Sequence, residues 1–199
     1  MKARLRDGTP VLIRPIVSTD KALLVEGLSR LSAESVYRRF LTFKARLNER
    51  QLQYFTDIDY NDHMAWIAVD PTEGAHSCLG VARYIRLRDD PTKAEVAVAV
   101  VDSHQGRGLG TLLLSRLWWS ALAAGIEVFV AYLLGENGRL LRVLGELNAD
   151  VWPEGGGVFR AELSLPKRLD CFPDSEAGQS FKRAAAQLAQ SLGSEDAAA

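Results

Sequence analysis

One segment, residues 95–117, limits the folds open to this chain more than any other. A valine-rich run at 95–101 leads into a turn with three glycines at alternate positions, and the turn leads directly into a leucine-rich stretch at 111–117. The apolar run is typical of a buried strand, and the leucine spacing after the turn is typical of a helix. The sequence therefore predicts a strand that begins at Ala94, a tight turn, and a helix over 109–124.

The glycine turn suits a ligand that carries phosphate. Gly106, Gly108 and Gly110 have no side chains that would keep a ligand away from the backbone amides. A helix that begins near Leu109 has first-turn N–H groups without internal partners, and the positive end of its dipole lies at the same point. A phosphate or pyrophosphate is therefore expected at this turn.

Two well-known phosphate loops fit the spacing poorly. A P-loop requires lysine followed by serine or threonine after its last glycine, whereas Thr111 follows Gly110 directly. A dinucleotide fingerprint requires a small residue in place of Thr111 and an acidic residue at the end of the next strand, whereas Glu127 stands before that strand. Neither motif accounts for the turn.

The segment Gln105-Gly106-Arg107-Gly108-Leu109-Gly110 resembles the Q/R-x-x-G-x-G/A acyl-coenzyme A loop of the Gcn5-related N-acetyltransferase (GNAT) superfamily. The predicted elements over residues 9–166 also follow the order of that superfamily. The resemblance implies an α+β fold, the α/β GNAT fold, with a mixed, mostly antiparallel central sheet and helices on both faces. It also implies a parallel pair of strands that splay apart to admit the pantetheine arm of acetyl-CoA.

The individual elements are predicted from apolar periodicity and capping residues. Strands are expected at 11–16, 64–70, 78–86, from 94, at 128–134 and at 158–165. Helices are expected after the caps at 18–20, over 31–40, after Asn48, over 109–124 and over 137–147.

Five separated segments carry a narrower resemblance. They look like the catalytic domain of bacterial protein lysine acetyltransferases of the Pat type, and they are 6–9 with 13–16, 31–32 with 35–40, 59–65, 80–86 and 94–97. In that family the domain is often fused to a cyclic-nucleotide-binding or an acyl-CoA-synthetase-like module. Neither module is expected within these 199 residues.

The implied chemistry needs a base. The pKa of a lysine ammonium is about 10.4, so only about one in 2,500 is a free amine at pH 7. The resemblance places the general base at Glu95, which would otherwise be a solvated charge at the head of a strand. It places the N–H that holds the oxyanion near Val100 or Val101. The cofactor-binding residues that it implies are Val100, Val101, Gln105, Gly106, Arg107, Gly108, Leu109, Gly110, Thr111 and Asn137.

One position departs from the family pattern. Many acetyltransferases have an asparagine followed seven residues later by a tyrosine that protonates the departing thiolate, but here Asn137 is followed by Leu144. Since a thiol with a pKa near about 8.5 is a tolerable leaving group, loss of that acid need not abolish activity. Besides a protein lysine acetyltransferase, two alternatives stay open: a small-molecule amine acetyltransferase, and a non-catalytic acyl-CoA sensor or interaction module.

Composition sets further limits. A formal net charge of -1 argues against general affinity for nucleic acid or anionic membranes. No stretch of 18 apolar residues and no apolar N-terminal leader occurs, and Cys78 and Cys171 lack metal-ligand spacing, so a cytoplasmic protein without a metal is expected.

The chain is expected to divide into an acetyltransferase domain at 1–166 and a C-terminal extension at 167–199. The extension is predicted to hold one helix and a disordered tail from 193. The helix has an apolar stripe that includes Phe181, Leu188 and Leu192. This stripe must pack on its own core, on a second copy in a homodimer, or on a partner, and the sequence does not decide among these.

Overall fold

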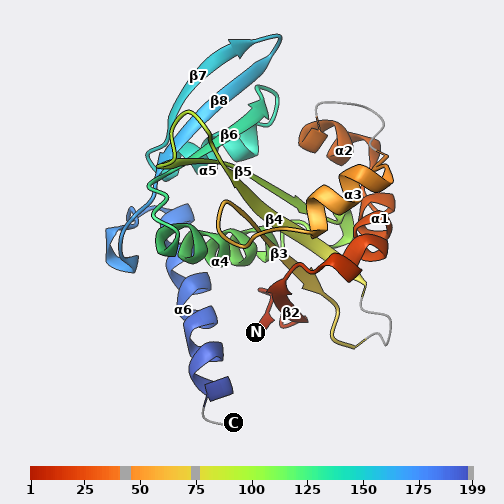
Figure 1. Ribbon diagram of the computed structural model, residues 1–199. Coiled ribbons are helices and arrows are strands. Elements are labelled where there is room, and N and C mark those ends of the chain that lie inside the picture. Colours follow the sequence, from red (N-terminus) through yellow and green to blue (C-terminus); the bar gives the residue numbers. More distant parts are fainter. Residues whose placement is uncertain (41–45, 73–76, 197–199) are drawn as a thin grey trace.

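The computed structural model of the protein describes residues 1–40, 46–72 and 77–196. Its eight described strands form one sheet in the order β1-β2-β3-β4-β5-β6-β8-β7 (Figure 1). The strands are β1 Lys2–Arg4, β2 Pro10–Pro15, β3 His63–Val69, β4 Cys78–Arg86, β5 Lys93–Val100, β6 Val128–Leu134, β7 Asp150–Gly155 and β8 Val158–Ser164.

The helices lie close to their predicted positions. They are α1 Lys21–Ser29, α2 Ala33–Phe40, α3 Glu49–Thr56, α4 Leu109–Ala123, α5 Gly138–Glu146 and α6 Glu176–Asp196, with short 3-10 turns at Ser18–Asp20, Asp102–His104 and Leu169–Cys171. The start of α3 is fixed by a capping box, in which the side chains of Asn48 and Gln51 each accept the other's backbone N–H at 2.9 Å.

Helices cover both faces of the sheet, as predicted. Figure 1 shows α1, α2 and α3 on one side, with α4 and α6 on the other. The main core lies between the sheet and α4, where Leu113, Leu117 and Trp118 are buried. Phe172 meets the Trp118 ring edge-on at a centroid distance of 5.0 Å, and Trp118 Nε1 donates to the carbonyl of Pro166 at 2.9 Å.

One pair of neighbouring strands is parallel, and it separates after three residues. Lys93–Glu95 of β5 pair with Val128–Val130 of β6, whereas the other neighbours in the sheet are antiparallel. Beyond Glu95, β5 continues to Val100 and β6 continues to Leu134 without further pairing between them in the described part of the chain. The predicted mixed sheet with a splayed parallel pair is confirmed.

Two strands were not predicted from the sequence. β1 has three residues, too few to show a period, and β7 contains Pro153 and ends at Gly155, both of which read as turn signals. Both strands lie at the edges of the sheet, where a proline costs no ladder hydrogen bond.

The C-terminal helix α6 packs on its own chain. Phe181, Ala185 and Leu188 are buried in the main core, and α6 contacts α4, α5 and β1. The helix extends to Asp196, and residues 197–199 lie outside the described residues. Across the described residues, we find no helix with the length and apolar character needed to span a membrane.

Candidate active site

Two glycines of the turn have a left-handed backbone. Gly106 has φ 73° and Gly108 has φ 92°, a region that residues with a side chain rarely adopt. Gly108 is the N-cap of α4, and its carbonyl accepts the first helical hydrogen bond, from Leu112 N at 3.1 Å. The N–H groups of Leu109, Gly110 and Thr111 therefore form the free first turn of a long helix.

Gln105 and Arg107 hold the turn in place with their side chains. Gln105 Nε2 donates to Val100 O and Ser35 Oγ, both at 3.0 Å, and to Asp102 Oδ1 at 3.1 Å. These bonds tie the turn to the end of β5 and to α2.

The Arg107 guanidinium reaches the turn between β1 and β2. It binds the Asp7 carboxylate and donates to Thr9 Oγ1 at 2.6 Å. The hydrogen bond from Arg107 holds the pKa of the Asp7 carboxyl well below its usual range. The side chains of both predicted cofactor residues are thus used to position the backbone amides.

Two arginines that the sequence reasoning missed lie beside the turn. A Cβ added at Gly106 would lie 3.9 Å from Arg139 Nη1, and one added at Gly108 would lie 3.3 Å from Arg6 Cγ. Arg139 follows Asn137 by two residues, which was a usable signal, whereas Arg6 is about a hundred residues away along the chain.

The backbone of β5 presents alternate amides to the gap. Val101 N donates to Leu79 O at 3.0 Å, so the N–H of Val101 is committed to β4. In an antiparallel ladder successive residues direct their N–H groups to opposite sides. The N–H groups of Ala97 and Ala99 therefore point toward β4, as that of Val101 does. The N–H groups of Val98 and Val100 point toward the gap.

Glu95 stands where the gap opens. It is the last residue of β5 that pairs with β6, opposite Val130, and it pairs with Ile85 of β4 on its other side. Its neighbour Ala94 is buried in the core beneath α4, so the Glu95 side chain projects from the other face of the sheet, where it is exposed. No cation of the described residues lies within 4 Å of its carboxylate.

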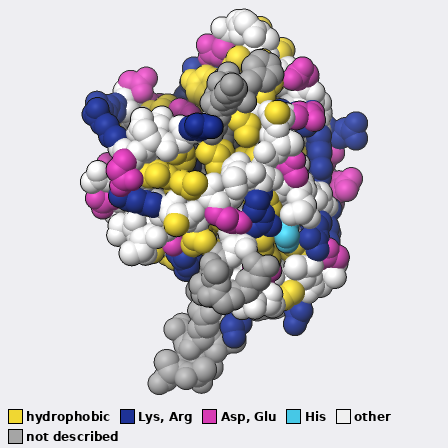
Figure 2. Space-filling view, turned by 90° about the vertical axis from the view of Figure 1, so that its right-hand side faces the viewer, with side chains coloured by type: hydrophobic (Ala, Val, Ile, Leu, Met, Phe, Trp, Pro, Cys, Tyr) yellow, Lys and Arg dark blue, Asp and Glu magenta, His cyan; other side chains and the backbone are white. Residues whose placement is uncertain are grey.

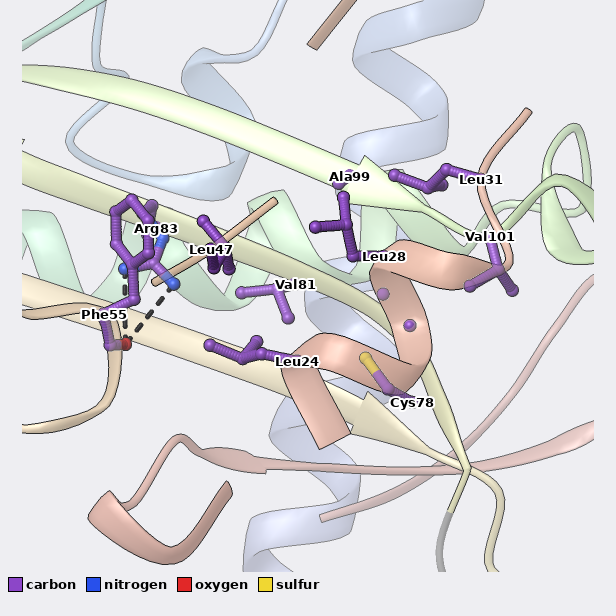
Figure 3. Close-up of a pocket in the computed structure, with 12 residues that line it drawn as sticks. Leu24, Leu28, Leu31, Leu47, Phe55, Cys78, Val81, Arg83, Ala99 and Val101 are labelled. Carbon is purple, nitrogen blue, oxygen red and sulfur yellow. Dashed lines mark hydrogen bonds between the residues drawn. The ribbon is translucent and has the colours of Figure 1, made fainter. Parts of the chain in front are cut away.

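An apolar pocket of about 70 Å³ lies on the same face, between α1 and strands β4 and β5 (Figure 3). Leucines of α1, Val81, Ala99 and Val101 form its walls, and Arg83 closes one end. The Arg83 guanidinium lies 4.3 Å from the centre of the Phe55 ring and donates to the Phe55 carbonyl at 3.4 Å.

Arg83 also contacts His63, with 2.9 Å between Nη1 and Nε2. Burial and the neighbouring guanidinium lower the pKa of His63 to about 4. His63 is therefore neutral at pH 7 and accepts a hydrogen bond, which fits a positioning role better than that of a base.

The two positions of α5 that the sequence singled out both have structural contacts. Asn137 Oδ1 accepts the N–H of Leu140 at 3.2 Å and so caps α5. Leu144 is buried against Leu133 and Ala161. Position 144 thus belongs to the core beneath α5.

The face formed by α1, α2 and α3 has no field of one charge. Figure 2 shows basic and acidic side chains interspersed over it, with hydrophobic side chains toward its centre. Such a surface offers no general attraction to a polyanion.

Residues 33–143 match the family model described as the acetyltransferase (GNAT) family. The chain belongs to this family. It is 34% identical over 165 residues to acetyltransferase Pat of Mycolicibacterium smegmatis, covering 82% of this chain and 48% of that protein. The chain therefore spans about half the length of this relative.

Solved structures agree with this family. The GNAT domain of S. lividans PAT superposes with a TM-score of 0.74 at 31% identity, over 83% of this chain and 96% of that one. YncA of Salmonella typhimurium, solved with its cofactor acetyl-CoA, superposes with a TM-score of 0.61 over 82% of this chain and 98% of that one. At 21% identity this second likeness concerns the fold alone.

Proposed function

We propose that this acetyltransferase moves the acetyl group of acetyl-CoA to a primary amine, a protein lysine, with Glu95 as the general base. The observation that carries the proposal is the position of Glu95. It is an exposed carboxylate at the point where β5 and β6 separate, on the strand that leads to the glycine turn.

Acetyl-CoA is the cosubstrate, and the two ends of the site suit its two parts. The first-turn N–H groups of Leu109, Gly110 and Thr111 would bind the pyrophosphate. The gap-facing N–H groups of Val98 and Val100 would pair with the amides of the pantetheine arm, as a neighbouring strand would.

Glu95 would accept a proton from the acceptor ammonium, directly or through one water. The free amine would then attack the thioester carbonyl, and coenzyme A would leave as the thiolate. No cation of the described residues lies within 4 Å of this carboxylate, so no ion pair competes with the acceptor for it. The acceptor would approach from the face of α1, α2 and α3, because the Glu95 side chain projects there.

The backbone donor for the oxyanion is best assigned to Val98. A strand rises about 3.3 Å per residue, so the N–H of Val98 lies about 10 Å along β5 from Glu95 and that of Val100 about 16 Å. The base and the donor must act on the same carbonyl carbon and its attacking amine, which favours the nearer group. We therefore assign the oxyanion donor to Val98, which is nearer to Glu95 than the Val100 or Val101 that the sequence led us to expect.

The choice of a protein lysine rests on the resemblance to Pat-type enzymes, supported by the match over 82% of the chain. Since the chain spans 48% of that relative, regulation of the whole protein is not transferred here. Cys78 and Cys171 are both free, which fits a reducing compartment, so the proposed location is the cytoplasm.

The test is single-turnover transfer from labelled acetyl-CoA in a lysate of the source cell, with Glu95→Gln beside the natural chain. The matched control is Glu127→Gln, an exposed glutamate just before β6. We expect label on a few proteins, a loss of at least about 100-fold in Glu95→Gln, and unchanged acetyl-CoA affinity by calorimetry.

Each other outcome has a defined meaning. Label on small amines would replace the protein acceptor with a small molecule. Tight acetyl-CoA binding without transfer by either chain would favour a sensor. Wild-type rates in Glu95→Gln would remove the base assignment.

A further inference from the structure

A second cleft, of about 300 Å³, lies beside the glycine turn, between the N-terminal hairpin and α6. Its walls include Arg4, Arg6, Gly108, Thr111, Ser180 and Arg183. Gln187 Nε2 of α6 donates to the carbonyl of Arg4 at 3.2 Å, so the two walls are joined. The cleft is thus a built part of the fold.

Positive charge converges in this cleft. Arg6 Nη2 and Arg183 Nη2 both donate to Ser180 Oγ, at 3.1 and 3.2 Å. Within the described ranges, no carboxylate lies within 4 Å of Arg4, Arg6 or Arg183. Two guanidinium groups that share one hydroxyl oxygen repel each other, and an anion between them would remove that repulsion.

The cleft adjoins the proposed pyrophosphate site. Gly108 and Thr111 line it, and they are the N-cap and part of the first turn of α4. An anion in the cleft would therefore also lie near the positive end of a 15-residue helix.

We propose that this cleft binds the 3′-phosphate of coenzyme A. The inference rests on the proposed function, because it takes the pyrophosphate to lie at the glycine turn. The 3′-phosphate is one ribose away from that pyrophosphate, carries a charge of about −1.5 to −2 at pH 7, and presents three acceptor oxygens. Guanidinium forks match such a group in shape as well as in charge.

The arginines of the cleft lie outside the family match. That match covers 33–143, which includes Gly108 and Thr111 but neither Arg6 nor α6. Under this proposal α6 would bind ligand through Arg183, besides covering the core with Phe181 and Leu188.

The test compares acetyl-CoA with 3′-dephospho-acetyl-CoA by calorimetry on the full chain. We expect the natural chain to bind acetyl-CoA about tenfold or more tightly than the dephospho compound, because hydrogen bonds to a charged phosphate contribute that much affinity. Arg183→Ala should lose most of that preference by weakening acetyl-CoA alone, and Arg183→Lys should keep part of it. Circular dichroism checks that each variant is folded.

Two matched controls separate this cleft from its surroundings. Lys182→Ala removes a cation from the adjacent position of α6, where Lys182 lies 4.0 Å from Asp174, and it should leave the preference unchanged. Arg139→Ala removes the guanidinium on the other side of the turn. Loss of the preference in Arg139→Ala but not in Arg183→Ala would overturn the proposal.

The remaining outcomes are also decisive. Equal affinity of the natural chain for both ligands overturns this inference alone, whereas binding of neither overturns the proposed function and this inference together. Binding of inorganic phosphate to the natural chain and to Arg183→Ala is measured as well. If Arg183→Ala binds phosphate more weakly but still prefers acetyl-CoA over the dephospho compound, the cleft binds a different phosphate compound and the assignment to coenzyme A is wrong.

Discussion

Replacing Leu144 with tyrosine tests which way position 144 faces. Leu144 is 7% exposed and packs against Leu133 and Ala161. A larger ring there would overpack the core at a cost of about 1–3 kcal/mol. A buried hydroxyl without a partner would add about 1–3 kcal/mol. We therefore expect the free energy of unfolding to fall by about 2–6 kcal/mol and kcat to stay at or below that of the natural chain.

The assay is thermal unfolding by calorimetry together with steady-state acetyl transfer. For a domain of this size each kcal/mol shifts Tm by about 2–4 °C, so Leu144→Tyr should lower Tm by about 4 to 24 °C. Leu144→Phe adds the ring without the hydroxyl and separates the two costs. Leu144→Ala should cost about 2–5 kcal/mol through the cavity that it leaves.

The reasoning is refuted by one pattern of results. If Leu144→Tyr keeps the natural Tm and raises kcat, and the gain disappears in Leu144→Phe, the hydroxyl must reach the departing thiolate. Position 144 would then face the gap, contrary to its burial beneath α5.

Two further perturbations test the site. The pKa of His63 in the folded chain, about 4, is below the ordinary value near 6.5, so the unfolded chain binds more protons than the folded chain between these pH values. The free energy of unfolding, measured by denaturant titration, should therefore fall as the pH falls from about 6.5 to 4. In His63→Asn this dependence on pH should flatten. Val98→Pro removes a gap-facing N–H without breaking the ladder with β4, and it should lower kcat by about 10²–10³. Val100→Pro should lower kcat far less. Equal losses of kcat in two variants of matched Tm would count against Val98 as the oxyanion donor.

The sequence predicted much of the fold because its long elements have strong patterns. The bounds of β4 and β6 coincide with the predicted 78–86 and 128–134, and α4 begins at Leu109 as the glycine turn indicated. The segments of β6 and α4 are apolar runs flanked by glycine, so local sequence decides both their type and their ends.

What the sequence could not predict depends on tertiary contacts. The side chains of Gln105 and Arg107 turn toward α2 and toward Asp7, partners that lie 70 and 100 residues away. The choice between Val98 and Val101 as a gap-facing donor depends on the register of β5 with β4, which no pattern within β5 reveals. The arginine cleft likewise exists only because α6 returns to the N-terminal hairpin.

The length of β5 explains why the site suits a coenzyme A thioester better than a shorter nucleotide. Glu95 and Val100 are about 16 Å apart along the strand, and the phosphate-binding turn begins beyond Val100. A ligand that uses both ends must therefore place a long linear arm between its phosphates and its reactive carbon, and pantetheine is such an arm. Since this requirement is set by a whole strand, single substitutions in the glycine turn should weaken binding without changing the class of ligand that the gap accepts.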